Sequence, residues 1–408
     1  MKIRSITYFL DPRWPLDPGG FKLAGDFIVT AQDAFSQAGF EVQTTRLATV
    51  PFPWLVKPLR AKELVALAQA LEEAGKEWGY NYISLGPALP EVPESYRLIP
   101  EALAATQNVF FSGVMASSTL GIVLPAVRSC AAVIRQASTI TSDGFTNLHF
   151  AALANVPPWS PFFPAAYADR PTPAFALATE AADLAVQAFN GASSLAEGRT
   201  ALIQAVETNA TNLERLAGNL EKAYQVQFRG IDFSMAPFPE PARSLGAALE
   251  AMGVPTAGTH GSLAAAAILT EILDRARFKR TGFCGLFLPL LEDAVLAQRA
   301  STGQLGLKDL LLLSAVCGTG LDTLPLPGNI TEESLAAVLV DLAALALRLD
   351  KPLTARLMPI PGKQAGESTA FDFAYFVNSR VMAVEAPTLK PPLLGVETIG
   401  IKPYRHRD

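Results

Sequence analysis

Short apolar runs alternate with longer amphipathic runs along most of this 408-residue chain. Short runs bounded by turn residues are typical of strands, and apolar residues that recur every three or four positions are typical of helices. The clearest helical period places apolar side chains on one face of a long helix, at residues 203, 206, 210, 213, 216, 220 and 223. The pattern predicts strands at 3–10, 41–48, 82–85, 109–114, 175–178, 230–235, 284–288, 324–326, 353–358 and 371–377.

Helices are predicted between most of these strands, at 21–38, 61–74, 119–136, 180–190, 203–223, 242–252, 262–277, 291–300, 307–316 and 331–349. Such alternation favours an α/β fold with crossover helices. The strand predicted at 284–288 is apolar on both faces, as a buried central strand should be. About ten strands are too many for a minimal doubly wound sheet, so a closed or nearly closed barrel surrounded by helices is expected.

Composition supports one large folded unit. Half of the residues are hydrophobic and 17% are charged, which fits a large buried core. Neither an internal repeat nor a low-complexity linker divides the sequence, so residues 1–408 are expected to form a single domain. The proline-rich stretch 157–173 is predicted to be a loop that covers part of this domain.

Charge and cysteine content exclude several classes of protein. The net charge is -5 and the basic residues are scattered, so no nucleic-acid partner is expected. Charged residues interrupt every apolar stretch before it reaches about 18 residues, and Asp11 ends the first run too early for a signal peptide. Three cysteines (Cys130, Cys284 and Cys317) build no disulfide framework. These observations predict a cytoplasmic protein without a membrane span.

Familiar cofactor motifs are absent from the sequence. Gly318 and Gly320 lack the third glycine of a dinucleotide-binding loop and follow a predicted helix. There is no Walker loop and no G-x-S-x-G nucleophile elbow. Three histidines, none paired at ligand spacing, do not predict a zinc site. No organic cofactor is expected. A binding site for a divalent cation such as Mg²⁺ or Ca²⁺ is compatible with the sequence, because these ions need only oxygen ligands.

Two stretches place polar residues where a strand meets a turn. In TSDGFTNLHFAA (141–152), Asp143 and Asn147 are candidates for orienting a substrate; turn and cap hydrogen bonds are the alternative. In GIDFSMAPFPEPARS (230–244), Asp232 and Ser234 share one face of a predicted strand. If that face points into a barrel, burial raises the pKa of Asp232 and suits it to acid–base work, with Glu240 nearby. The alternative makes Glu240 a helix-start residue.

Two further stretches are rich in glycine. In AGTHGSLAAAA (257–267), His260, Gly261 and Ser262 open a predicted helix, where free N–H groups favour an anion; a histidine that only caps the helix is the alternative.

In VCGTGLDTLPLPGN (316–329), Cys317 follows a helix and Gly318 permits a sharp bend before Asp322. A helix C-terminus disfavours a thiolate, so Cys317 is expected to line a pocket or to be structural, and Asp322 is the stronger candidate for chemistry.

Taken together, these stretches carry a family resemblance. With GFCGLFLPLLEDAVLAQRA (282–300) and FAYFVNSRVMAV (373–384), they resemble domain of unknown function 711, also called uncharacterised protein family 0210, over nearly the whole chain. The resemblance implies a ten-stranded α/β barrel surrounded by helices, like that of pyruvate formate-lyase and other glycyl radical enzymes. It implies no established activity. Ala383 stands where those enzymes carry the radical glycine, and no adjacent cysteine pair is present, so radical chemistry is not expected.

Three functions follow as hypotheses. The first is an enzyme (a lyase, isomerase or hydrolase) that acts on a small anionic metabolite, with the catalytic and binding residues named above converging in one pocket. The second is a protein that binds an amino acid or organic acid and works with an ACT-domain partner, which the family resemblance suggests. The third is a carboxylate-metal enzyme with Asp232, Glu240 or Asp322 as ligands. Apolar helix faces and base rates favour a homodimer.

Overall fold

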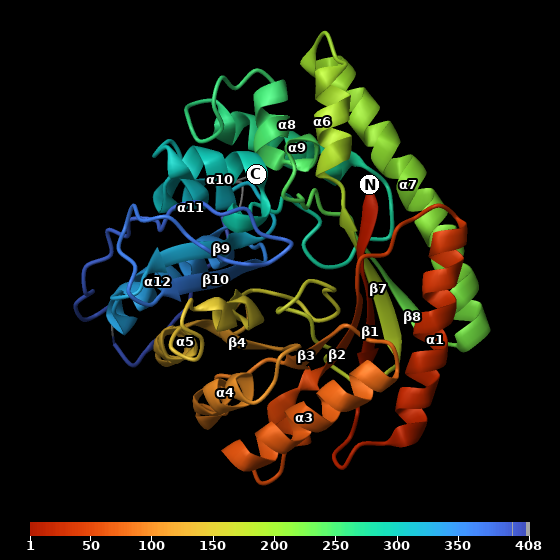
Figure 1. The fold of residues 1–408 in the computed structure, drawn as a ribbon, viewed down its shortest axis with the longest axis vertical. Helices are drawn as coiled ribbons and strands as arrows, with labels where there is room; N and C mark the ends of the chain where they lie inside the picture. Colours follow the sequence, from red (N-terminus) through yellow and green to blue (C-terminus); the bar gives the residue numbers. More distant parts are fainter. Residues whose placement is uncertain (394, 405–408) are drawn as a thin grey trace.

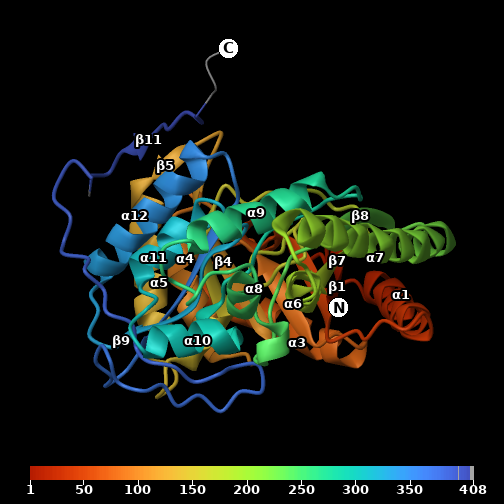
Figure 2. The same cartoon turned by 90° about the horizontal axis from the view of Figure 1, so that it is seen from above.

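A single eleven-stranded sheet runs through the molecule and is surrounded by helices (Figures 1 and 2). This computed structural model describes residues 1–393 and 395–404 and confirms the mixed α/β class. The strands are β1 (Lys2–Leu10), β2 (Thr45–Pro51), β3 (Tyr82–Gly86), β4 (Val109–Ser117), β5 (Gly121–Val123), β6 (Phe150–Ala154), β7 (Ala174–Glu180), β8 (Gln227–Asp232), β9 (Gly320–Pro327), β10 (Leu353–Ile360) and β11 (Thr398–Ile399). The helices are α1 (Pro18–Gln37), α2 (Phe52–Leu55), α3 (Ala61–Glu77), α4 (Glu94–Ala104), α5 (Leu124–Ala137), α6 (Ala182–Asn190), α7 (Leu195–Tyr224), α8 (Leu245–Ala251), α9 (Ser262–Arg275), α10 (Ala294–Ser301), α11 (Leu307–Ser314) and α12 (Glu332–Arg348).

The direction of the strands determines which residues meet at each edge of the sheet. The strand order is β8-β7-β1-β2-β3-β4-β6-β10-β9, with β5 and β11 beside β4. Strands β1 to β4 and β6 are mutually parallel, whereas β7 and β10 are antiparallel to β1 and β6. The amino ends of the five parallel strands therefore lie at the same edge as the carboxyl ends of β7 to β10.

The predicted count of ten strands is wrong. Residues 284–288 and 371–377 form no regular strand, whereas β5, β6 and β11 were not predicted. At 284–288 the ladder is interrupted because Cys284 has a φ of 45° and Gly285 is pressed against the backbone of Gly318. Residues 371–377 are held instead by the side chain of Asn378, which accepts a hydrogen bond from the Phe371 N–H (2.8 Å) and donates one to its carbonyl (3.1 Å).

Regular pairing does not connect the edge strands β8 and β9 in the part of the chain that the structure describes. The segment 280–289 lies between them and forms isolated bridges with both, at Ile231↔Arg280, Met235↔Leu286 and Pro289↔Asp322. The structure therefore shows an eleven-stranded sheet whose two edge strands are connected only through the isolated bridges of this irregular segment. None of the helices within residues 1–393 and 395–404 combines the length and apolarity needed to span a bilayer.

The two faces of the sheet pack against different partners. On β1, Tyr8 contacts Phe27 of α1 on the helix side, while the next residue, Phe9, contacts Trp159 on the other side. Trp159 belongs to the segment 157–173, the predicted covering loop (yellow in Figure 1), of which residues 159–166 are buried and residues 169–172 are exposed. The Thr7 hydroxyl donates to the Pro161 carbonyl of this segment at 3.2 Å. This bond helps to hold the aromatic residues of the segment against the face of the sheet that carries Phe9.

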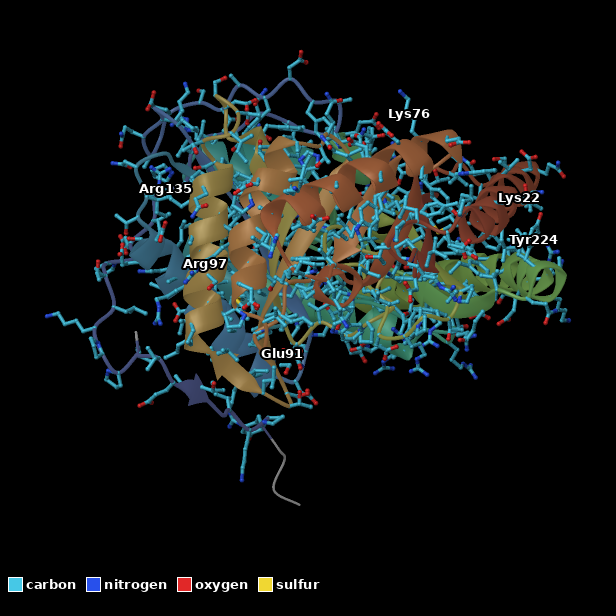
Figure 3. All side chains as sticks on the ribbon, turned by 90° about the horizontal axis from the view of Figure 1, so that it is seen from below. Lys22, Lys76, Glu91, Arg97, Arg135 and Tyr224 are labelled. Carbon is cyan, nitrogen blue, oxygen red and sulfur yellow. The ribbon has the colours of Figure 1, made fainter. Side chains whose placement is uncertain are left out.

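The long amphipathic helix is confirmed as α7. The Ser194 side chain caps it by accepting a hydrogen bond from the Glu197 N–H at 3.2 Å. At its other end the Tyr224 hydroxyl donates to the Asp26 carbonyl of α1 at 3.1 Å, and Figure 3 shows Tyr224 beside that helix. Four residues of the predicted apolar face are buried, whereas Ala223 is exposed; the buried four are Val206, Ala210, Leu213 and Leu220.

Replacing Gly318 by alanine is expected to lower the free energy of unfolding by about 1–3 kcal/mol. A Cβ atom at this position would lie 2.7 Å from the Cα of Gly285, so two backbone segments would have to separate. Urea denaturation measures the change. Gly218→Ala is the matched control: no atom lies within 4 Å of its added Cβ, and the helix should gain about 0.5–1 kcal/mol. Equal effects of the two substitutions would contradict the close packing.

Candidate functional site

A cavity of about 170 Å³ opens at the edge of the sheet where the amino ends of β1 to β4 meet the carboxyl end of β10. Gln107 and Asn108 are exposed and lie at its mouth. Its walls combine charged and aromatic side chains drawn from strand ends and from four other segments, at 145–149, 162–163, 292 and 373–375. The lining residues are Arg4, Gln43, Thr44, Arg46, Tyr82, Gln107, Asn108, Phe110, Phe145, Leu148, His149, Phe162, Phe163, Glu292, Arg356, Phe373 and Tyr375.

Three arginines and two carboxylates form a buried ionic cluster at the cavity. Arg356 of β10 donates to both oxygens of Asp322 (2.6 and 3.0 Å) and to Glu292 (3.0 Å). Glu292 also accepts from Arg4 of β1. Because Arg4 and Arg356 outweigh the effect of burial, the pKa of Glu292 lies below its usual value. With Arg46, the cluster holds three positive and two negative groups, so one positive charge is unbalanced.

Arg46 carries this unbalanced charge. It is buried in β2, where its Nε donates to the Thr44 hydroxyl at 2.9 Å. Within the described residues it makes no ion pair, and its two terminal nitrogens have no hydrogen-bond acceptor. Burial lowers its pKa to about 9, so the guanidinium remains charged at neutral pH. A buried cation without an anionic partner is costly unless a ligand supplies one.

Aromatic rings follow one another around the cavity wall. Successive ring centroids are 5.3, 4.6, 6.1, 5.1 and 5.3 Å apart, and most pairs meet edge to face or tilted. The rings belong, in this order, to Tyr82, Phe110, His149, Phe145, Phe373 and Tyr375. The cavity thus has two kinds of wall. The arginines form a cationic wall, and these rings form an aromatic wall.

His149 ends the short 3-10 helix η1 (Phe145–His149) and is half-buried against Phe110. Burial is the main reason that its pKa falls from 6.5 to about 4. The imidazole is therefore neutral at pH 7 and can accept or donate a hydrogen bond to a ligand in the cavity.

Acidification from about pH 7 to pH 5 is expected to cost about 2 kcal/mol of unfolding free energy through His149 alone. The unfolded chain takes up a proton as the pH falls through 6.5, whereas the folded chain resists protonation until about pH 4, so stability falls over this window. Urea denaturation at both pH values tests this. In His149→Phe the loss should shrink by that amount; an unchanged pH dependence would show that His149 is not held neutral.

The polar side chains of the second predicted stretch, residues 230–244, stabilise the fold and do not form the cavity. Asp232 is buried and accepts from the N–H groups of Phe283 and Cys284 (both 2.9 Å) and from the Ser234 hydroxyl. Burial raises the pKa of this carboxyl, as the sequence predicted. Glu240 is exposed and lies 3.8 Å from Arg243. None of these residues lines the cavity.

The third and fourth stretches also lie outside the cavity lining. His260 and Gly261 are exposed at the start of α9, while the Ser262 hydroxyl accepts from the Gly258 N–H at 2.9 Å. Cys317 is fully buried, and its carbonyl accepts a hydrogen bond from Lys351. Gly318 is used for backbone packing, as described above. Asp322 alone among the predicted catalytic residues contacts a lining side chain, Arg356.

The first stretch comes closest to the cavity. Asp143 accepts from the Phe145 N–H at 3.0 Å, and Asn147 donates to the Ile134 carbonyl at 3.1 Å. These bonds fix η1, which carries Phe145, Leu148 and His149 to the wall. The predicted turn and cap bonds are therefore present, and they position the site indirectly. The predicted convergence of all eleven candidates in this cavity does not occur.

A carboxylate metal site would need its ligands to gather. Asp232, Glu240 and Asp322 have different partners: backbone N–H groups, Arg243 and Arg356 respectively. Across residues 1–393 and 395–404, no three or more His, Cys, Asp or Glu side chains are grouped to hold a metal ion.

Comparison with known proteins gives a consistent result. The family model described as "Uncharacterised ACR (DUF711)" matches residues 1–377. The UPF0210 protein of Pyrobaculum aerophilum is 34% identical over 350 residues, covering 81% of this chain and 76% of the relative. The UPF0210 protein of Pyrobaculum arsenaticum is 32% identical over 394 residues (90% and 86%), and that of Methanosarcina mazei is 29% identical over 366 residues (85% and 80%).

Proposed function

Because the chain belongs to the DUF711 family, whose description names no activity, we propose from the geometry alone that its cavity binds a small organic anion. The proposal rests on one observation: the buried guanidinium of Arg46 lies on the cavity wall and makes no ion pair among the described residues. An anionic ligand would supply the missing charge, while the aromatic wall would bury its apolar part.

A thermal-shift screen tests this proposal, since a ligand that binds only the folded state raises the melting temperature. The probes are organic carboxylates and phosphate monoesters, each compared with its neutral amide or alcohol. Anions are expected to raise the melting temperature in a saturable way, and their neutral counterparts are not. A screen in which no anion exceeds its neutral counterpart would refute the proposal.

One observation favours catalysis as a second candidate function. The neutral imidazole of His149 faces the same cavity as Arg46, where it could exchange a proton with a bound anion. Exchange of carbon-bound hydrogen into D₂O, followed by NMR for each anion that binds, would detect such chemistry. His149→Phe should stop the exchange even at an anion concentration that saturates the variant. Binding without exchange or turnover would favour the regulatory alternative, with an ACT-domain partner.

The glycyl radical enzyme barrel remains a proposal for the fold. It is supported by the bridges that segment 280–289 makes to both edge strands, and by the two opposed strand sets. Ala383, at the position of the radical glycine, does not line the cavity. The proposed site is therefore independent of radical chemistry.

A further inference from the structure

We infer that the ligand of this cavity is a carboxylic acid with a single aromatic ring, an inference that rests on the proposed anion-binding function. The carboxylate lies against Arg46 and the ring lies among the aromatic side chains. Three observations lead to this class of ligand: the free edge of the Arg46 guanidinium, the composition of the wall, and the volume of the cavity.

The free edge of Arg46 fits a carboxylate. Its Nε is engaged with Thr44, which leaves the two terminal nitrogens as a pair of parallel donors. Such a pair matches the two oxygens of a planar carboxylate, with two parallel hydrogen bonds. Arg4 and Arg356 are already paired with Glu292 and Asp322, so their charges are largely neutralised, which disfavours the doubly charged phosphate more than a carboxylate.

The wall favours an aromatic body over a cationic one. Aromatic rings can surround a quaternary ammonium group, but this cavity is lined by three arginines and one glutamate, so its charge opposes a cation. A neutral ring can pack edge to face against Phe110, Phe145 and Phe373, as these side chains already do with their neighbours.

The volume of the cavity fits a ligand with one ring. The cavity measures about 170 Å³. An engineered apolar cavity of about 150 Å³ holds benzene. One six-membered ring therefore fills most of the space, and a short carboxylate arm fills the remainder near Arg46.

Matched acids test the inference by isothermal titration calorimetry. Benzoate and phenylacetate are compared with their saturated counterparts, cyclohexanecarboxylate and cyclohexylacetate, which have the same charge and connectivity. Each aromatic acid is expected to bind about tenfold tighter than its counterpart. In Phe110→Leu, the ratio of the two affinities should fall to about twofold; Phe145→Leu serves the same purpose if the first variant does not fold.

The outcomes separate this inference from the proposal beneath it. Equal binding of aromatic and saturated acids, or binding of phosphate monoesters alone, would overturn the aromatic carboxylate and leave anion binding standing. Binding of benzamide as tightly as benzoate would overturn the role of the carboxylate. Failure of every anion, in this titration and in the thermal-shift screen, would overturn both.

Discussion

Replacing Asp322 by alanine is expected to lower the free energy of unfolding by about 3–5 kcal/mol. Asp322 and Arg356 are 1% and 5% exposed, and they share two hydrogen bonds of 2.6 and 3.0 Å. Removal of the carboxylate leaves Arg356 buried with only Glu292, which Arg4 also engages. Urea denaturation near neutral pH, with the slope checked for two-state behaviour, measures the loss.

Two comparisons isolate the buried charge as the cause. Glu385→Ala removes an exposed ion pair with Lys308 (2.7 Å) and should leave the denaturation midpoint unchanged. The double variant Asp322→Ala/Arg356→Met removes both charges and should recover a large part of the lost stability, because apolar groups can replace a buried pair. If the double variant is less stable than Asp322→Ala alone, the cost does not come from an unpaired arginine.

The repeating βα pattern was sufficient to predict the mixed α/β class and most helices. It failed where tertiary contacts override local preference. Residues 150–154 read FAALA, an alanine-rich sequence without strand preference, yet they form β6 between β4 and β10. Residues 371–377 look like a strand, but the Asn378 side chain bonds the backbone of Phe371, and Phe373 and Tyr375 line the cavity. The sequence pattern predicted a regular strand at 284–288, whereas residues 280–289 contact both edges of the sheet only through isolated bridges.

The cavity could not be predicted from the usual position of ligands in α/β folds, which is at the carboxyl ends of parallel strands. Here the opposed strand sets bring the starts of β1 to β4 to the site, and with them Arg4, Arg46, Tyr82 and Phe110. One sequence signal could have revealed it. IRSITYF, TTRLATV and TARLMPI each contain one arginine within an apolar strand, and a buried arginine requires a partner or a function.

Replacing Arg46 by methionine is expected to weaken binding of an anionic ligand by at least about 100-fold. The guanidinium provides the only unpaired positive charge of the described cavity wall, so no other lining side chain can replace it. Calorimetric titration with the tightest anion of the screen measures the loss. Arg46→Lys retains the charge without the paired donors and should recover only part of the affinity.

The stability of the same variant separates a ligand-binding arginine from a structural one. If Arg46 served the fold, Arg46→Met would lower the melting temperature of the ligand-free protein. We expect no decrease, or a rise, because the variant removes a buried charge that makes no direct ion pair with a carboxylate among the described residues. Arg229→Met is the matched control: Arg229 lies 4.4 Å from the Trp159 ring, outside the cavity lining, and its loss should leave affinity unchanged.

A stable Arg46→Met protein with wild-type affinity would place the anion elsewhere, whereas an unstable one would assign Arg46 to the core. Weak binding combined with undiminished stability is the result that a site built for a ligand requires.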